Sequence, residues 1–358
     1  MRAAFVAVVG RPSSGKSSIV NRICGHKVSI VSPVPQTTRN RIRGIFTEER
    51  GQLVFLDTPG FHLSERKMNQ ELKRVALMSL EEVDLVLYVV DPTREPGEEE
   101  EMIAEAVAMA PQPTIIAVNK LDLLASGGRG APISGAPGDA EPAAGPAPGA
   151  ASGDSEAATR AAGDPGAPAG GEVPSSWRAF LEERFPGVPS APVSAATGAG
   201  MDTLSAALFE AAPEGEPFYP GEYYTDQDPS FRISETIREQ VIRRTSQEVP
   251  HAVYVDVVDA RFQRAKSPGR SGGGSATAAE TEGEAPPQRL AVRAVIYVER
   301  ESQKGIVVGR GGAMIRDIRK GSEQTLRELF PYPVSLDLRV KVNPKWRRKD
   351  AVLRRLLR

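Results

Sequence analysis

Cysteine and histidine are scarce in this chain of 358 residues, which contains one cysteine, Cys24, and three histidines. A single thiol cannot form an intramolecular disulfide, and the histidines at positions 26, 62 and 251 do not have the spacing of metal ligands. The sequence therefore argues against a disulfide-stabilised scaffold and against a Cys/His zinc site. The low cysteine content fits a reducing compartment such as the cytosol.

Long apolar runs are also missing, since no stretch approaches the roughly 20 residues that a membrane-spanning helix requires. The apolar residues at 3–9 follow a basic residue, but they lack a cleavage site and lead directly into a glycine-rich loop. We therefore expect this stretch to be a buried first strand and not a signal peptide.

The chain as a whole has no large excess of positive or negative charge, since it has 45 Lys and Arg against 46 Asp and Glu. The charges are segregated, however, because residues 289–358 contain 18 basic and only 7 acidic side chains. A basic end on a nearly neutral chain indicates a polyanionic partner for that end.

Large aliphatic residues are nearly absent from two segments, 126–174 and 266–288, which consist mainly of glycine, alanine, proline, serine and acidic residues. Such segments cannot bury enough apolar surface to offset the loss of backbone entropy on ordering. We predict that the first is a disordered insertion and the second a low-complexity loop between two strands.

The remaining residues predict two domains. In residues 1–215, apolar runs at 4–9, 53–57, 84–91, 114–119 and 191–194 alternate with helical patterns at 69–80, 98–110 and 203–211. This alternation predicts an α/β domain with a mostly parallel sheet that has helices on both faces. After a linker at 216–228, residues 229–358 predict a smaller α+β domain in the order helix, strand, strand, helix, helix, strand, helix. Its first helix is expected at 231–248.

A glycine-rich loop follows the first predicted strand. The sequence GRPSSGKS matches the G-x-x-x-x-G-K-[ST] pattern, in which backbone amides and a helix N-terminus surround a phosphate group. We expect the Lys16 ammonium to bridge the β- and γ-phosphates and the Ser17 hydroxyl to bind Mg²⁺. The predicted phosphate-binding residues are Gly10, Arg11, Pro12, Ser13, Ser14, Gly15, Lys16, Ser17 and Ser18.

A second motif, DTPG, follows the predicted strand at 53–57. Asp57 at the strand end suits Mg²⁺ binding, and the Gly60 amide suits the γ-phosphate, so this motif predicts a site for Asp57, Thr58, Pro59, Gly60 and Phe61. Upstream, Thr38 is the expected threonine ligand of Mg²⁺, with Thr37 as the alternative. For hydrolysis we assign Lys16, Thr38 and Gly60, because charge neutralisation and an aligned water drive phosphoryl transfer. Phe61 cannot orient that water by hydrogen bonding, and a resemblance to GTPases with an apolar residue at this position implies slow intrinsic turnover.

The third motif, NKLD at Asn119, Lys120, Leu121 and Asp122, selects the base. A carboxylate at position 122 can accept two hydrogen bonds only from a base with both an N1–H and a 2-amino group, and that base is guanine. A buried site of this kind can discriminate by about 10⁴–10⁵. Ser194 and Ala195 complete the set, with the Ala195 amide expected on the guanine O6. Together these motifs predict a GTP-binding and GTP-hydrolysing switch.

The basic end carries a different loop, Gly309 to Gly312, between two predicted helices. A G-x-x-G loop of this kind clamps the backbone of about four nucleotides in KH domains. The pattern is common by itself, but the α-β-β-α-α-β order and the local positive charge favour RNA binding. The predicted RNA-binding residues are Lys304, Gly305, Ile306, Gly309, Arg310, Gly311, Gly312 and Arg316.

Over nearly its whole length the chain resembles the Era family, through the sequences GRPSSGKS, PQTTRNR, DTPGFH, NKLD, SAATG, KGIVVGRGGAMIRDI and VKVNPKW. The resemblance implies a P-loop GTPase domain followed by a type II KH domain, with GTP, GDP and Mg²⁺ as ligands. It also implies binding to small-subunit ribosomal RNA near its 3′ end and a role in maturation of the small ribosomal subunit. We further expect a cytoplasmic monomer, and association with the inner face of the cell membrane stays open.

Two departures from the family pattern affect these expectations. Ser13 and Ser14 replace the usual Asn-Val, which puts potassium-assisted hydrolysis in doubt, and the insertion at 126–174 is unusual. Two alternative functions also stay open: an RNA-binding scaffold with a weak or regulatory nucleotide site, and another translation-factor-class GTPase that acts on tRNA.

Overall fold

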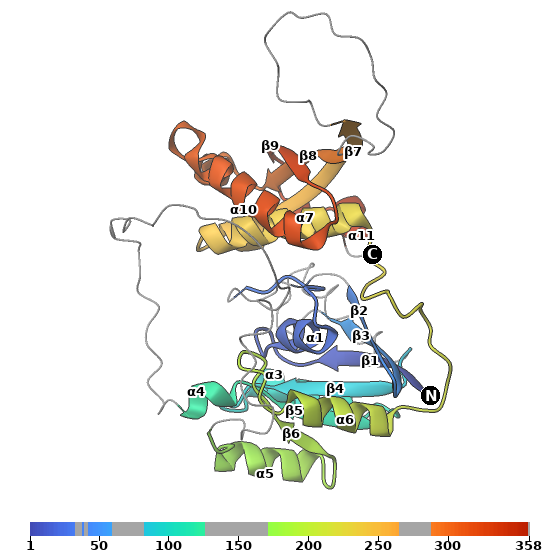
Figure 1. The fold of residues 1–358 in the computed structure, drawn as a ribbon. Helices are drawn as coiled ribbons and strands as arrows, with labels where there is room; N and C mark the ends of the chain where they lie inside the picture. Colours follow the sequence, from blue (N-terminus) through green and yellow to red (C-terminus); the bar gives the residue numbers. More distant parts are fainter. Residues whose placement is uncertain (33–37, 39–41, 59–81, 126–170, 265–287, 357–358) are drawn as a thin grey trace, which may run out of the picture.

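The computed structural model describes residues 1–32, 38, 42–58, 82–125, 171–264 and 288–356, which form an N-terminal α/β part and a C-terminal α+β part (Figure 1). The predicted helix at 69–80, most of the insertion (126–170) and the loop at 265–287 lie outside the described residues. Among the described residues, no helix is long and apolar enough to cross a membrane.

The N-terminal part is built on a six-stranded sheet with the strand order β2-β3-β1-β4-β5-β6. Strands β1, β3, β4, β5 and β6 are parallel, and β2 pairs antiparallel with β3 at the edge. The strands are β1 (Arg2–Val9), β2 (Ile42–Glu48), β3 (Gly51–Asp57), β4 (Leu85–Val90), β5 (Thr114–Val118) and β6 (Ser190–Pro192). The sequence patterns predicted the five parallel strands but not β2, because its seven residues, IRGIFTE, do not alternate between apolar and polar.

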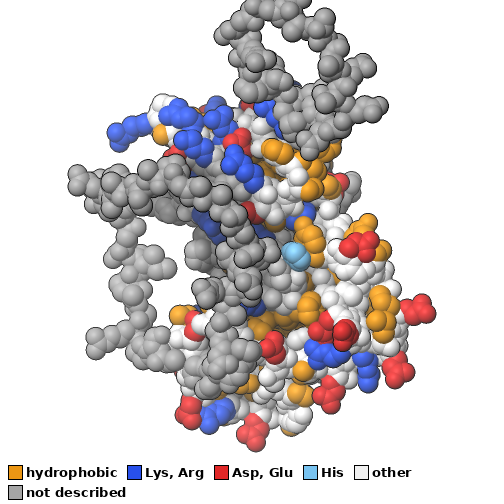
Figure 2. Space-filling view, in the orientation of Figure 1, with side chains coloured by type: hydrophobic (Ala, Val, Ile, Leu, Met, Phe, Trp, Pro, Cys, Tyr) orange, Lys and Arg blue, Asp and Glu red, His pale blue; other side chains and the backbone are white. Residues whose placement is uncertain are grey.

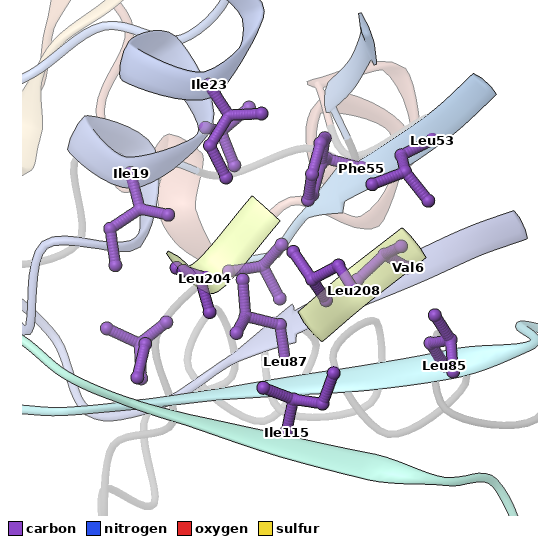
Figure 3. Close-up of a cluster of buried hydrophobic side chains, with 14 of the residues drawn as sticks. Val6, Ile19, Ile23, Leu53, Phe55, Leu85, Leu87, Ile115, Leu204 and Leu208 are labelled. Atoms are coloured by element: carbon purple, nitrogen blue, oxygen red, sulfur yellow. The ribbon is translucent and has the colours of Figure 1, made fainter. Parts of the chain in front are cut away.

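Helices cover both faces of this sheet, as predicted. On one face, α1 (Lys16–Cys24) and α6 (Met201–Ala211) pack on apolar side chains of the strands, as Figure 3 shows for Ile19 and Ile23 of α1 and Leu204 and Leu208 of α6. On the other face, α3 (Glu98–Ala108) and α5 (Ser175–Arg184) contribute to a second core with β4 and β5, next to the short α4 (Leu121–Ala125). Continuous apolar strands such as β4, all buried, suit a sheet that is covered on both sides.

The C-terminal part contains a three-stranded sheet in the order β7-β8-β9, with β7 and β8 antiparallel and β8 and β9 parallel. Its strands are β7 (Tyr254–Arg264), β8 (Gln288–Val298) and β9 (Val334–Val342). Alternate residues of β8, from Leu290 to Val298, are buried against helices, as their spacing predicted. The helices are α7 (Pro229–Arg244), α8 (Val249–Ala252), α9 (Glu301–Val308), α10 (Ala313–Leu329) and α11 (Asp350–Leu356).

The order of these elements confirms the predicted fold class, with one correction. The expected helix at 231–248 instead ends at Arg244 and is followed by the separate helix α8. Gln247, with φ 58°, adopts a left-handed conformation that a continuous right-handed helix cannot include. Two short 3₁₀ turns, at Arg310–Gly312 and Trp346–Arg348, complete the C-terminal part.

The two parts of the chain touch through polar contacts near the end of α1. Glu239 of α7 is fully buried, and its carboxylate pairs with Lys27 at 2.5 Å and accepts a hydrogen bond from the Val31 amide at 3.3 Å. The segment predicted as a linker runs along the first sheet, where the Gln52 side chain accepts from the amides of Phe218 and Tyr219. The segment is therefore fixed to the sheet along part of its length.

Candidate nucleotide site and KH loop

The nucleotide motifs meet at one edge of the first sheet. Gly10, Asp57, Asn119 and Ser194 lie at or just beyond the carboxyl ends of β1, β3, β5 and β6. Because these strands are parallel, their carboxyl ends lie at the same edge of the sheet, where ligands bind in open α/β folds. The structure thus brings together motifs that are up to 184 residues apart in the sequence.

The phosphate loop needs glycine at two positions because neighbouring groups approach closely. Gly10 has φ 150°, and a Cβ there would lie 2.2 Å from the Val89 carbonyl oxygen. Gly15 has φ 98°, and a Cβ there would lie 2.1 Å from the Asn119 side-chain nitrogen. Ser13 also has a positive φ, of 64°, which is uncommon for a residue with a side chain. The loop conformation therefore depends on contacts from β4 and from the NKLD motif.

Lys16 is buried below this loop, and its Nζ donates hydrogen bonds to the carbonyl oxygens of Gly10, at 3.0 Å, and Arg11, at 2.8 Å. Burial lowers the pKa of Lys16 to about 8, an effect that the charges of Asp57 and Glu100 oppose. A phosphate group at the loop would supply the negative charge that keeps this ammonium protonated.

Three oxygen groups come together beside Lys16. The Ser17 hydroxyl donates to Asp57 Oδ2 at 2.7 Å and lies 3.0 Å from the Thr38 hydroxyl, which is 3.4 Å from the same carboxylate oxygen. Asp57 is fully buried, which raises its pKa, and its Oδ1 has no hydrogen-bond partner among the described residues. A carboxylate and two hydroxyls are the hard donors that Mg²⁺ prefers, so these residues fit the predicted metal.

The base motifs form a connected loop system. The Asn119 side chain donates to the Ser14 carbonyl at 2.9 Å, and the Ser194 hydroxyl donates to Asp122 Oδ1 at 2.6 Å. Lys120 has a positive φ of 64°, and its ammonium pairs with Asp91 at 2.6 Å. The Ala195 amide donates to the Asn119 Oδ1 at 3.0 Å, and its expected contact with the guanine O6 stays a prediction.

Several predicted site residues face the protein interior. The Thr58 hydroxyl donates to the Val8 carbonyl at 2.7 Å, and Leu121 belongs to the apolar core. The Arg11 side chain turns into the protein, where it forms an ion pair with Glu100, a buried residue of α3. Burial raises the pKa of Glu100, and the hydrogen bond from Tyr88 and the charge of Arg11 oppose this shift.

Sequence motifs gave no sign of Glu100, Tyr88 or Asp91. A signal for Glu100 does exist, since Glu100, Ile103, Ala104 and Val107 share one face of α3 and all are buried. Of the other predicted residues, Pro12 and Ser14 are buried in the loop and Ser18 is half-buried on α1. Pro59, Gly60, Phe61 and Thr37 lie outside the described residues.

The GxxG loop between α9 and α10 is built differently. Gly309, Gly311 and Gly312 have positive φ values of 72°, 54° and 75°, which glycine adopts without the steric penalty of a side chain. The Arg310 side chain is exposed, and Arg316 donates to the Gly311 carbonyl at 2.7 Å. Lys304 and Gly305 on α9 flank the loop together with Ile306, whose side chain is 51% exposed. Figure 2 shows Lys and Arg side chains gathered on the side of the C-terminal part where α10 lies.

Comparisons with known proteins found protein families that match each half of the chain. Residues 5–120 match a family described as a 50S ribosome-binding GTPase, and residues 276–347 match the KH domain. The chain is 39% identical over 359 residues to a protein named GTPase Era from Treponema denticola, with 99% of each covered, and 34% identical over 360 residues to GTPase Era from Borreliella burgdorferi, with 100% of each covered.

Two solved structures are similar over nearly the whole chain. One is Era from Aquifex aeolicus, a variant bound to GDP and AlF4⁻, with a TM-score of 0.76, 27% identity, and 99% of this chain and 98% of that one covered. The other is Era in complex with MgGDPNP and nucleotides 1506–1542 of 16S ribosomal RNA, with a TM-score of 0.74, 27% identity and the same coverage. The full-length identity to curated relatives, joined to a GTPase fold and a KH fold in one chain, shows that this protein belongs to the GTPase Era family.

Proposed function

We propose that this GTPase binds small-subunit ribosomal RNA near its 3′ end through the KH loop and acts as a GTP-controlled switch in maturation of the small ribosomal subunit. The observation that carries the proposal is the full-length similarity to an Era structure that holds both a GTP analogue and 16S ribosomal RNA nucleotides. A scaffold with a degenerate nucleotide site is not favoured, because Lys16, Ser17, Asp57 and Asp122 are all present and positioned by neighbouring groups.

In the nucleotide site, Lys16 would contact the β- and γ-phosphates, and Ser17, Thr38 and Asp57 would hold Mg²⁺. When bound, Mg²⁺ neutralises charge on the phosphate oxygens. The chain's own part is to hold the donors in place, and the phosphate-loop amides and the N-terminus of α1 would face the phosphate groups. Asp122, fixed by Ser194, would accept two hydrogen bonds from guanine. Gly60 would bind the γ-phosphate through its amide.

In the KH part, the GxxG loop leads directly into α10, a helix of 17 residues whose N-terminal amides suit a phosphate group. Gly305 and Gly311 leave open space, since no atom lies within 4 Å of a Cβ built at either position. The backbone of a nucleic acid can therefore approach closely, while Arg310 adds positive charge and the exposed Ile306 offers an apolar surface to a base. The expected monomeric state, a cytoplasmic location and contact with the membrane's inner face stay predictions.

The test is GTP turnover by the full chain, measured with and without purified small ribosomal subunits, together with titration of a labelled RNA fragment from the 3′ end of 16S ribosomal RNA. We expect binding of the fragment that weakens steeply as salt concentration rises, because phosphate contacts release counterions. We also expect turnover to change when subunits are present. Binding that is no tighter than to a scrambled RNA of the same length would reject the proposed RNA target.

A further inference from the structure

The Arg11 side chain lies inside the protein although Arg11 belongs to the phosphate loop. It is 5% exposed, and its guanidinium donates to the carbonyl oxygens of Glu95 at 3.2 Å and Asp91 at 3.5 Å. The Trp177 ring of α5 lies 5.6 Å from the guanidinium carbon. These three contacting residues lie outside the phosphate loop, so the Arg11 side chain anchors the loop to the segment that follows β4 and to α5.

Glu100 of α3 is the anionic partner of this anchor. It is fully buried, one carboxylate oxygen pairs with Arg11, and the other accepts a hydrogen bond from the Tyr88 hydroxyl. Three other glutamates, 98, 99 and 101, share the first turn of α3, and none of them is buried. Burying a carboxylate and a guanidinium costs free energy that an apolar pair would avoid. This cost makes a role beyond packing worth testing.

The anchor reaches Lys16 through the backbone of Arg11. The Arg11 carbonyl oxygen accepts a hydrogen bond from the Lys16 ammonium at 2.8 Å and from the Ser14 amide at 3.3 Å. Holding the Arg11 side chain therefore fixes the carbonyl group that orients Lys16. We propose that Glu100 is a positioning residue for the nucleotide site, which acts through Arg11 to hold the phosphate loop and Lys16 in the geometry that binds the β- and γ-phosphates.

This inference rests on the proposed role of Lys16 as the phosphate ligand. The experiment uses the full chain and compares five variants with wild type: Glu100→Gln, Arg11→Met, the double variant of both, Glu101→Gln and Lys16→Ala. Glu101 is the matched control, because it is the next residue of α3 and pairs with Arg184 at the surface at 2.6 Å. Dissociation constants of GTP and GDP and the melting temperature without nucleotide are measured for each.

We expect Glu100→Gln to weaken binding of both GTP and GDP, by about 10- to 100-fold, since the loss of a hydrogen bond to a charged group has an effect of this size. The loss extends to GDP because the loop contacts the β-phosphate that both nucleotides carry. Glu101→Gln should bind both nucleotides as wild type does. Lys16→Ala should lose at least as much affinity as Glu100→Gln.

The double variant separates positioning from simple stabilisation. Arg11→Met with Glu100→Gln removes both buried charges, so it avoids the uncompensated buried charge that makes loss of one partner strongly destabilising. We expect the melting temperature to return to that of wild type while the loss of nucleotide affinity persists. Recovery of both quantities would overturn the inference, as would Glu100→Gln binding like Glu101→Gln. If Lys16→Ala bound GTP as tightly as wild type, the proposed nucleotide site itself would fail, whatever the Glu100 variants showed.

Discussion

Two glycine-rich loops in this chain face phosphate groups in the proposed function, and they are built in opposite ways. In the phosphate loop, Gly10 and Gly15 are in close contact with β4 and Asn119, and Lys16 is 6% exposed. In the GxxG loop, Gly311 has no neighbour within 4 Å of a Cβ position, and Arg310 is exposed. The first conformation is imposed by tertiary contacts, whereas the second is largely a property of the local backbone.

The difference suits the two proposed ligands. A mononucleotide that must be distinguished from its analogues needs desolvated, paired groups, since an unmatched polar group in a buried site is costly. An RNA backbone bound by charge and close approach needs an accessible loop and little else. We therefore expect substitutions in the nucleotide site to affect stability and binding together, and substitutions in the KH loop to affect mainly binding.

The largest effect is expected at the base, the most selective end of the buried site. Asp122→Asn should change the preferred base from guanine to xanthine, because the amide reverses one donor–acceptor match, and the change in relative preference should approach about 10⁴-fold. The Ser194 hydroxyl, which donates to Asp122 Oδ1, can donate to the new amide oxygen as well. Competition binding with GTP, ATP and xanthosine triphosphate measures the preference. An unchanged preference for GTP would mean that Asp122 does not contact the base.

A matched pair of glycine substitutions compares the two loops directly. Gly15→Ala combines φ 98° with a contact of 2.1 Å to Asn119, so we expect about 100-fold weaker GTP binding and a loss of about 3 kcal/mol in unfolding free energy. Gly311→Ala, at φ 54° with open space around it, should cost only about 1 kcal/mol and leave GTP binding unchanged. Chemical denaturation and nucleotide titration of both variants provide the measurements. Similar losses in the two variants would contradict the contrast between the loops.

The same contrast explains what the sequence could predict. The phosphate loop, NKLD and GxxG motifs are local patterns with a local cause, and their positions at strand ends and before helices agree with the structure. The contact between Arg11 and Glu100 joins residues 89 apart, and a run of four glutamates resembles an exposed helix start. The antiparallel edge strand β2 was missed for a related reason, because Gly44 lies against α1 residues and its fit depends on packing. The spacing of sequence motifs does not indicate such tertiary contacts.

The KH loop offers the third test, in which binding should change without a change in the other half of the chain. Arg310→Asp with Gly311→Asp places two carboxylates where phosphates must approach, and we expect at least about tenfold weaker binding of the 3′-terminal 16S RNA fragment. GTP affinity and basal turnover should stay as in wild type, because Lys16, Ser17 and Asp57 lie in the other part of the chain. RNA titrations at two salt concentrations measure the effect. If this double variant binds RNA as wild type does, the RNA-binding surface lies elsewhere, and the basic stretch 341–349 is the next candidate.

The smallest expected effect is a change in proton binding, which distinguishes the buried ammonium of Lys16 from the exposed guanidinium of Arg310. Burial lowers the pKa of Lys16 to about 8 in the free protein, so above this pH the folded chain binds fewer protons at Lys16 than the unfolded chain. The free energy of unfolding should therefore increase as pH rises from about 8 towards 10.5, the unperturbed pKa of lysine. Phosphates stabilise the ammonium, so nucleotide binding above about pH 8 should take up as much as about one proton.

Calorimetric titration of GTP in buffers of different ionisation enthalpy, without Mg²⁺ so that Asp57 does not contribute through metal binding, measures this uptake. Lys16→Met, which has no ammonium to protonate, is the control and should take up fewer protons than wild type. Contacts of Arg310 with RNA should contribute no such uptake over the same range, because arginine stays charged in proteins throughout it. Equal proton uptake by wild type and Lys16→Met would show that the buried ammonium does not titrate when the nucleotide binds.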